Sequence, residues 1–171
     1  RISSIEESEI DEAMLQLLAH YPQVVDHLHI PLQSGSSSVL KRMKRKYDTA
    51  AFLKTLASIR QIRPDIAITT DVIVGFPGAS EEEWKETLDF CRKAGFAEIH
   101  VFPFSPRSGT YAATLPDTPA PMKEKRVQEL LALSKELRQE YESRFYGKSL
   151  SILFEDFNAK ESLAYGHSGN Y

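Results

Sequence analysis

A row of polar side chains interrupts the otherwise aliphatic segment HLHIPLQSGS at residues 27–36. Successive side chains of a strand point to opposite faces, so a strand over 27–32 has one aliphatic and one polar face. The pattern fits a sheet edge with satisfied polar groups, or a barrel interior that faces a ligand. We favour the ligand, because Gln33 and the turn at 34–36 stand where α/β proteins bind ligands. The polar face carries His27, His29, Pro31 and Gln33.

A lone carboxylate stands in the next strand, which we expect over residues 66–74. Asp71, Ile73 and Gly75 share one face of that strand. An ionised carboxylate is costly to bury unless it is paired or binds a polar ligand, so Asp71 is expected to point into a barrel interior. Gly75 allows a flat ligand to approach the backbone closely. The turn at 75–78 is equally well explained as a tight strand-to-helix connection.

Aromatic side chains follow in a strand expected over 98–102, where His100, Phe102 and Phe104 form one face. Arg107 lies just beyond, in a loop rich in glycine and proline. Aromatic rings beside an arginine suit a ligand that combines a ring with a carboxylate or phosphate. The alternative is a core aromatic row with a solvated arginine.

A basic run places five cations in the six positions 41–46, and Tyr47 adds an aromatic side chain. Such a run is usually a solvated helix face. It also fits a patch that binds the phosphates of a nucleic acid. The cations that we assign to the patch are Lys41, Arg42, Lys44 and Arg45.

Short β-rich runs alternate with longer helical patterns, which favours βαβ units and a parallel sheet. Thr49 is the expected cap of one helix, and Ser80 with Glu83 forms a capping box for another. A long helix over 122–146 should end at Gly147. The expected strands are 1–5, 27–32, 66–74 and 98–102. After Gly147, residues 150–154 alternate between apolar and polar side chains, which indicates a half-buried strand and a second, small β domain.

The composition excludes several classes of protein. The 171 residues have a formal charge of −3, with 42% hydrophobic and 26% charged residues, as in soluble globular proteins rather than wholly basic nucleic-acid binders. No apolar run reaches the length of a membrane span, so no membrane partner is expected. No metal site is expected either: His27 and His29 lack an evident third ligand. The single cysteine, Cys91, excludes a disulfide within the chain and a cluster held by this chain alone.

Four segments together resemble the radical S-adenosylmethionine methylthiotransferases: HIPLQSGS (29–36), VLKRMKRKY (39–47), DVIVGFPG (71–78) and HVFPFSPRSGT (100–110). They stand in the family's order and spacing and cover essentially the whole chain. The resemblance implies an α/β fold in which residues 1–147 form the later part of a partial (β/α)6 TIM-like barrel. Residues 148–171, with GHSGNY at 166–171, resemble the truncated start of a TRAM domain. Ala79 departs from the acidic residue that usually follows the family's GFPG turn.

The resemblance also implies an activity for a longer protein. It implies a cytoplasmic enzyme that adds a methylthio group to C2 of a hypermodified adenosine in tRNA, with S-adenosylmethionine and two 4Fe-4S clusters as cofactors. Gln33-Ser34-Gly35 resembles the two tRNA branches of the family rather than the branch that modifies a ribosomal protein. HVFP at 100–103 and the loop with Arg107 resemble the threonylcarbamoyladenosine branch more than the isopentenyladenosine branch. The cluster cysteines are expected upstream of residue 1, so we expect no catalytic residue in this chain and no activity of the chain alone. The rival interpretation is a non-catalytic RNA-binding module, and the sulfur donor stays open.

The same resemblance, with the strand alternation, assigns two sets of side chains. The S-adenosylmethionine pocket is expected to include Gln33, Ser34, Asp71, Ile73, Gly75, Phe104 and Arg107. The tRNA contacts are expected from Lys41, Arg42, Lys44 and Arg45.

Overall fold

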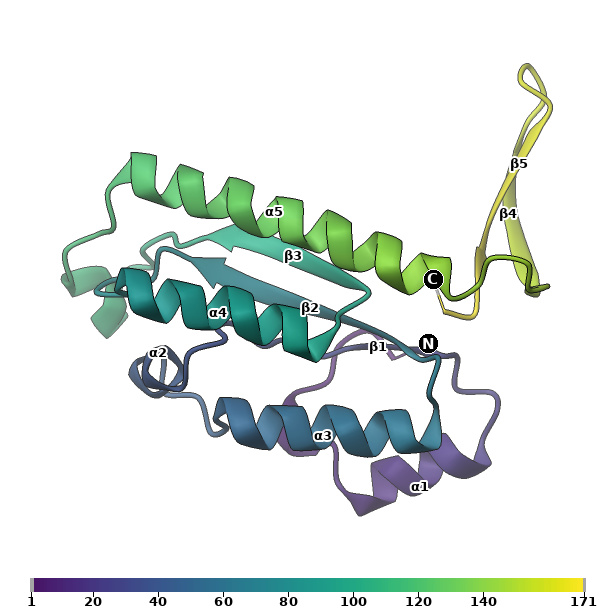
Figure 1. Ribbon diagram of the computed structural model, residues 1–171, viewed down its shortest axis with the longest axis horizontal. Coiled ribbons are helices and arrows are strands. Elements are labelled where there is room, and N and C mark those ends of the chain that lie inside the picture. Colours follow the sequence, from purple (N-terminus) through teal and green to yellow (C-terminus); the bar gives the residue numbers. More distant parts are fainter. Residues whose placement is uncertain (1, 171) are drawn as a thin grey trace.

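A three-stranded parallel sheet lies at the centre of the computed structural model, which describes residues 2–170 (Figure 1). The strand order is β1–β2–β3, with β1 at His27–His29, β2 at Ala67–Val74 and β3 at Glu98–Pro103. The expected parallel α/β arrangement is therefore confirmed for this part of the chain. Each strand is followed by helical structure, as the right-handed βαβ connection requires.

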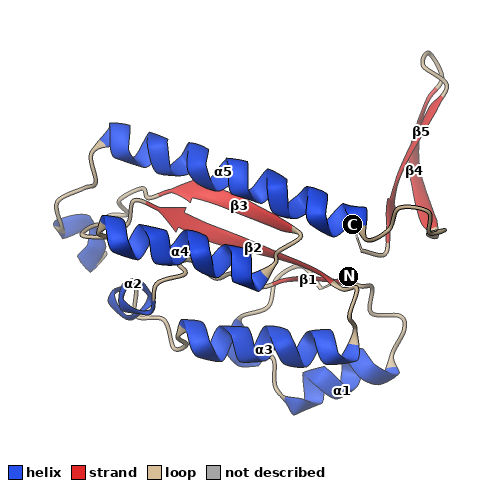
Figure 2. Ribbon diagram, viewed as in Figure 1, coloured by secondary structure: helices blue, strands red, loops and turns tan. Residues whose placement is uncertain are grey.

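Helices cover one face of this sheet (Figure 2). Alternate strand residues on the covered face, including Leu28, Ile68 and Val72, are at most 1% exposed. They join one hydrophobic cluster with side chains from α3, α4 and α5. The opposite face carries Asp71 and Phe102, and Phe102 is 50% exposed. The helices are α1 at Glu12–His20, α2 at Ser37–Arg42, α3 at Thr49–Ile62, α4 at Glu81–Ala94 and α5 at Ala120–Ser143; short 3-10 turns occupy Glu7–Glu9 and Tyr111–Thr114.

The ends of the helices follow local sequence signals. Ser80 accepts a hydrogen bond from the backbone N–H of Glu83, and the Glu83 carboxylate accepts one from the N–H of Ser80, which confirms the capping box. Gly95 ends α4 in the left-handed conformation, with φ +60°. The expected cap at Thr49 is wrong, because Asp48 accepts the hydrogen bond from the N–H of Ala51. Aspartate at the preceding position reaches the orphan N–H, and Thr49 becomes the first helical residue.

The long helix α5 buries a face that includes Leu130, Leu133 and Leu137. Arg126 is also buried on this face, at 2% exposure, and donates to the carbonyl oxygens of Ala79 and Ser80. Its guanidinium thereby fixes the turn that precedes α4.

The two ends of the chain differ from the sequence-based expectation. The strand expected at 1–5 is wrong for residues 2–5. These residues make one backbone hydrogen bond to β1, from Ile5 N–H to His29 O at 3.0 Å, and form no strand; Arg1 lies outside the described residues.

Beyond α5, β4 at Ile152–Asn158 and β5 at Leu163–Ser168 form an antiparallel hairpin that projects from the α/β body (Figure 1). Both of its faces are largely exposed, so the expected half-buried strand is wrong: no second layer packs on it within the described residues. None of the helices within residues 2–170 has the length and hydropathy of a membrane span.

Candidate functional site at the open face of the sheet

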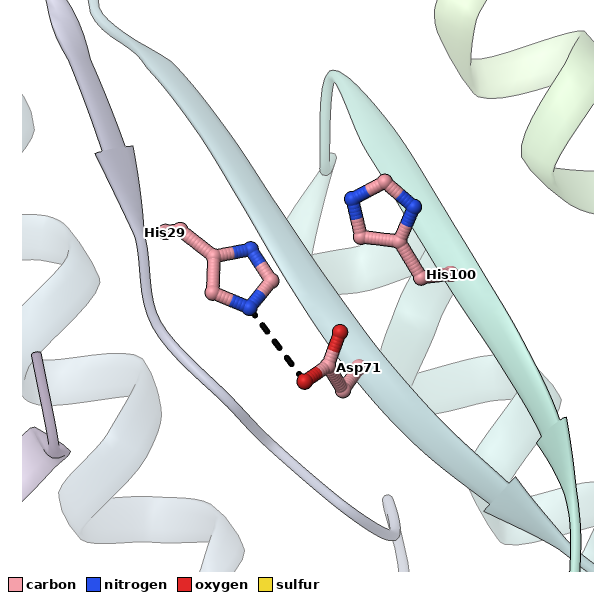
Figure 3. Close-up of side chains that lie close together, drawn as sticks. All are labelled: His29, Asp71 and His100. Carbon is pink, nitrogen blue, oxygen red and sulfur yellow. Dashed lines mark ion pairs between the residues drawn. The ribbon is translucent and has the colours of Figure 1, made fainter. Parts of the chain in front are cut away.

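The register of the three strands brings one set of polar side chains together on the open face. His29 of β1 stands opposite Thr69 of β2, and His100 of β3 stands opposite Asp71. Residues in register point to the same face, and Thr69 and Asp71 are two residues apart. His29, Asp71 and His100 therefore converge on one spot from three neighbouring strands (Figure 3).

Asp71 points away from the covering helices, as its cost of burial predicts. Its Oδ2 lies 3.3 Å from Nε2 of His29, a charge partner that the sequence pattern did not show. His29 is held in turn by its Nδ1, 2.9 Å from the Thr69 hydroxyl. The His29 and His100 rings lie with centroids 5.5 Å apart. The absence of a metal site was expected because His27 and His29 lack a third ligand; the structure instead groups His29 with Asp71 and His100, three side chains whose ligand atoms could hold an ion, and His27 is not among them.

Gln33 lies beside this cluster, as predicted. Its N–H donates to Asp71 O at 2.8 Å, and its carbonyl accepts from Ile73 N–H at 2.9 Å. It adopts φ +70°, which is uncommon for a residue with a side chain and is held here by the bridge to β2. Gln33 and Asp71 thus lie next to each other through main-chain bonds.

Two expected pocket residues have structural explanations instead. Ser34 is buried, and its hydroxyl lies 3.3 Å from the Thr87 hydroxyl of α4, on the helix side of the sheet. Gly75 adopts φ +76°, and a Cβ there would lie 2.5 Å from Cγ of Lys123. The space above Gly75 is therefore filled by a lysine stem, and the close approach of a flat ligand is not what this glycine permits.

Phe104 and Arg107, the two residues expected at the far end of the pocket, lie in different environments. Phe104 packs edge-on against Phe76, and Nζ of Lys123 donates to its carbonyl oxygen at 3.1 Å. Arg107 lies in the exposed loop that follows, where its carbonyl accepts from the Thr110 hydroxyl. The structure does not bring the Arg107 side chain to Asp71.

The basic run lines a groove of about 990 Å³ at the carboxyl ends of the strands. One wall is formed by residues 41–45, and the other includes Ile73 of β2 and Tyr111, which is 69% exposed. Ile73 stands two residues beyond Asp71 on the open face. The groove therefore reaches the open face at Ile73, whereas Asp71 and Gln33 do not line it.

The cations of the run differ in how free they are. Both terminal nitrogens of Arg42 donate to the Glu83 carboxylate at 2.7 Å, and this bond lowers the pKa of Glu83 to about 2. Arg45 lies 3.3 Å from Glu6. Lys41 and Lys44 are exposed and form no ion pair within the described residues. The phosphate-binding assignment therefore holds best for the two lysines.

Two further side chains of interest are part of the core. Tyr47 is buried and donates its hydroxyl to the carbonyl oxygens of Pro31 and Leu32, and burial raises its pKa to about 12. Tyr47 therefore holds the segment that follows β1, and its buried ring cannot stack on a nucleic-acid base. Cys91 is buried, and desolvation raises its pKa to about 12. Cys91 therefore lies in the hydrophobic core, away from the open face of the sheet.

Comparison with known families places this fold. Residues 3–91 match the model of the radical SAM superfamily, and the chain belongs to that superfamily. The solved structure of coproporphyrinogen III oxidase HemN from Escherichia coli, a radical SAM enzyme, matches with a TM-score of 0.60 at 21% identity over 78% of this chain and 31% of that one. At that identity the likeness shows the fold alone.

The curated relatives are tRNA methylthiotransferases. The chain is 44% identical, over its whole length, to threonylcarbamoyladenosine tRNA methylthiotransferase MtaB of Bacillus subtilis, of which it covers 39%. It is 38% identical to the MtaB of Thermotoga maritima over 96% of the chain and 38% of that protein. It is also 38% identical to tRNA-2-methylthio-N(6)-dimethylallyladenosine synthase of Bacillus pumilus over 91% of the chain and 31% of that protein. The chain thus spans well under half the length of these relatives.

Proposed function

We propose that this chain forms the cofactor- and tRNA-facing part of a cytoplasmic tRNA methylthiotransferase that acts on C2 of a threonylcarbamoyladenosine. The observation that carries the proposal is the groove lined by the basic run, which reaches the open face at Ile73, two residues beyond Asp71. A polyanion at Lys41 and Lys44 would lie along this groove, and a small cofactor at Asp71 would lie next to its Ile73 end. The 44% identity to a threonylcarbamoyladenosine enzyme over the whole chain supports this nucleoside over the isopentenyladenosine one.

The open face fits S-adenosylmethionine in its chemistry. Oδ1 of Asp71, the carboxylate oxygen that does not face His29, offers an acceptor for ribose hydroxyls or an amino group. Gln33 offers an amide, and Ile73 offers an apolar surface for a purine. When bound, that cofactor supplies a methyl group and a radical precursor. The chain's own residues bind and orient it, while the lysines hold the phosphates of the substrate.

A 4Fe-4S cluster does not fit the residues present. Such clusters are held by cysteine thiolates, and the sequence contains only the buried Cys91. We propose that cluster ligands come from outside these 171 residues, and that the chain by itself has no methylthiolation activity. In the same scheme, residues 2–147 are the later part of the barrel and the β4–β5 hairpin is the beginning of a TRAM domain.

The test is an analysis of tRNA nucleosides from cells in which the gene encoding this chain is deleted, then restored as wild type or as Asp71→Asn. We expect 2-methylthio-threonylcarbamoyladenosine to disappear on deletion, with its unmethylthiolated precursor accumulating. Wild type should restore it, and Asp71→Asn should restore it poorly at equal protein level. Loss of the isopentenyladenosine derivative instead would assign the other branch, and no change in either would favour the non-catalytic RNA-binding module.

A further inference from the structure

Three side chains with metal-ligating groups meet on the open face, from three different strands. One ligand atom each from His29, Asp71 and His100 lies within 4.8 Å of the others. We propose that this cluster binds one divalent first-row transition metal, with Zn²⁺ as the preferred ion. The site is distinct from any iron–sulfur cluster, because it uses imidazole and carboxylate ligands and no cysteine.

The spacing of the first two ligands matches tetrahedral coordination. Ligand atoms about 2.0–2.1 Å from zinc at the tetrahedral angle lie about 3.3–3.4 Å from each other. Nε2 of His29 and Oδ2 of Asp71 are 3.3 Å apart. An ion placed between them needs no movement of either backbone, since both residues sit in paired strands.

The environment of His29 is that of a metal ligand. Its second ring nitrogen, Nδ1, lies 2.9 Å from the hydroxyl of Thr69, which is 4% exposed. Ligating histidines use their other nitrogen in this way, which fixes the ring and leaves the first nitrogen aimed at the ion. Thr69 is thus a positioning residue for the proposed site.

His100 distinguishes a metal site from a simple ion pair. An ion pair between His29 and Asp71 would explain why these two side chains lie together, but it gives no reason for His100 to lie beside them. The His100 ring is tilted by 43° against the His29 ring and takes no part in the bonds that fix His29 and Asp71. It is exposed, so rotation of its side chain can bring a nitrogen into the first shell.

Three protein ligands leave the fourth position of a tetrahedral ion without a protein ligand, and His100 on this face is exposed. Open positions of this kind are typical of catalytic rather than structural zinc. Two imidazoles and one carboxylate suit Zn²⁺, Fe²⁺ and Co²⁺ better than Mg²⁺ or Ca²⁺, which prefer oxygen ligands alone.

The test is a titration of the 171-residue chain with Co²⁺, followed by displacement with Zn²⁺, in the absence of S-adenosylmethionine and tRNA. We expect one Co²⁺ per chain with the intense visible absorption of tetrahedral cobalt, and its loss when Zn²⁺ is added. His100→Ala should weaken binding by more than the 10–100-fold that removal of an outer partner costs. Thr69→Val should weaken it by about 10–100-fold and keep the tetrahedral spectrum.

The matched control is His20→Ala, which removes an exposed histidine at the last residue of α1 that is not part of the cluster. It should leave the affinity unchanged. Because His100 is exposed, we expect His100→Ala to keep the melting temperature of the wild type. A loss of Co²⁺ binding at an unchanged melting temperature then reports the loss of a ligand and not unfolding. Absence of stoichiometric binding in the wild type, or equal affinity in the wild type and His100→Ala, overturns the proposal. Neither result bears on the nucleoside test, because no cofactor or tRNA is present.

Discussion

The two faces of the same three strands obey different rules. On the covered face, polar groups are few and each is matched within the chain: the Thr70 hydroxyl donates to Ile30 O at 2.7 Å and accepts from Leu32 N–H at 2.9 Å. On the open face, Asp71 and His100 are partly or fully exposed. Buried polar groups without hydrogen-bond partners are costly, so a row of polar side chains is stable only where solvent, a ligand or other side chains bond to it. This difference supports our proposal that the functional site lies on the face that carries Asp71 and His100.

The largest expected effect comes from placing a charge on the covered face. Val72 is fully buried between Asp71 and Ile73, so Val72→Asp puts an unpaired carboxylate into the core. We expect a loss of several kcal/mol in the free energy of unfolding, enough to prevent folding. Asp71→Asn, one residue away, should change that free energy by at most about 1 kcal/mol. Urea denaturation measures both, and comparable losses would mean that the two faces are not different.

A smaller effect separates free from paired cations at the groove. Lys41 and Lys44 are exposed, whereas Arg42 is held by Glu83. Changing both lysines to Gln should reduce the log–log salt dependence of tRNA binding by about 0.7–0.9 per lost phosphate contact. Arg42→Gln should reduce it less, because its charge is already neutralised. The measurement is binding at a series of salt concentrations, and equal slopes in all variants would make the run a solvated face.

The smallest effect concerns pH and the Glu83–Arg42 pair. Arg42 holds the pKa of Glu83 at about 2, below its ordinary value of 4.5. A lowered folded-state pKa contributes stability that is present above about pH 4.5 and is lost as the pH falls toward 2. Because the Arg42 side chain is 38% exposed, we expect the contribution to be about 1 kcal/mol. The difference in stability between wild type and Glu83→Gln should shrink over this range, and a constant difference would contradict the assignment.

Local signals determined most of the elements. The near-continuous β-branched run at 66–74 predicted β2, and the Ser80–Glu83 box predicted the start of α4. These succeeded because a cap or a strand pattern is satisfied by neighbours in sequence. The strand expected at 1–5 failed because its pairing partner had to come from β1 in space, and only one such bond forms.

The candidate site divides in the same way. Alternation along one strand was enough to predict that Asp71 faces away from the helices and that Gln33 lies near it, because a carboxylate avoids the core. The strand register alone decided that His29 and His100 stand beside Asp71, since register depends on contacts 29 to 42 residues apart. The contacts of Ser34 with Thr87 and of Gly75 with Lys123 could not be predicted, because these partners belong to helices distant in sequence. The sequence determined which side chains carry chemistry, and the tertiary structure decided which of them meet, because side-chain type is local while packing and sheet pairing are not.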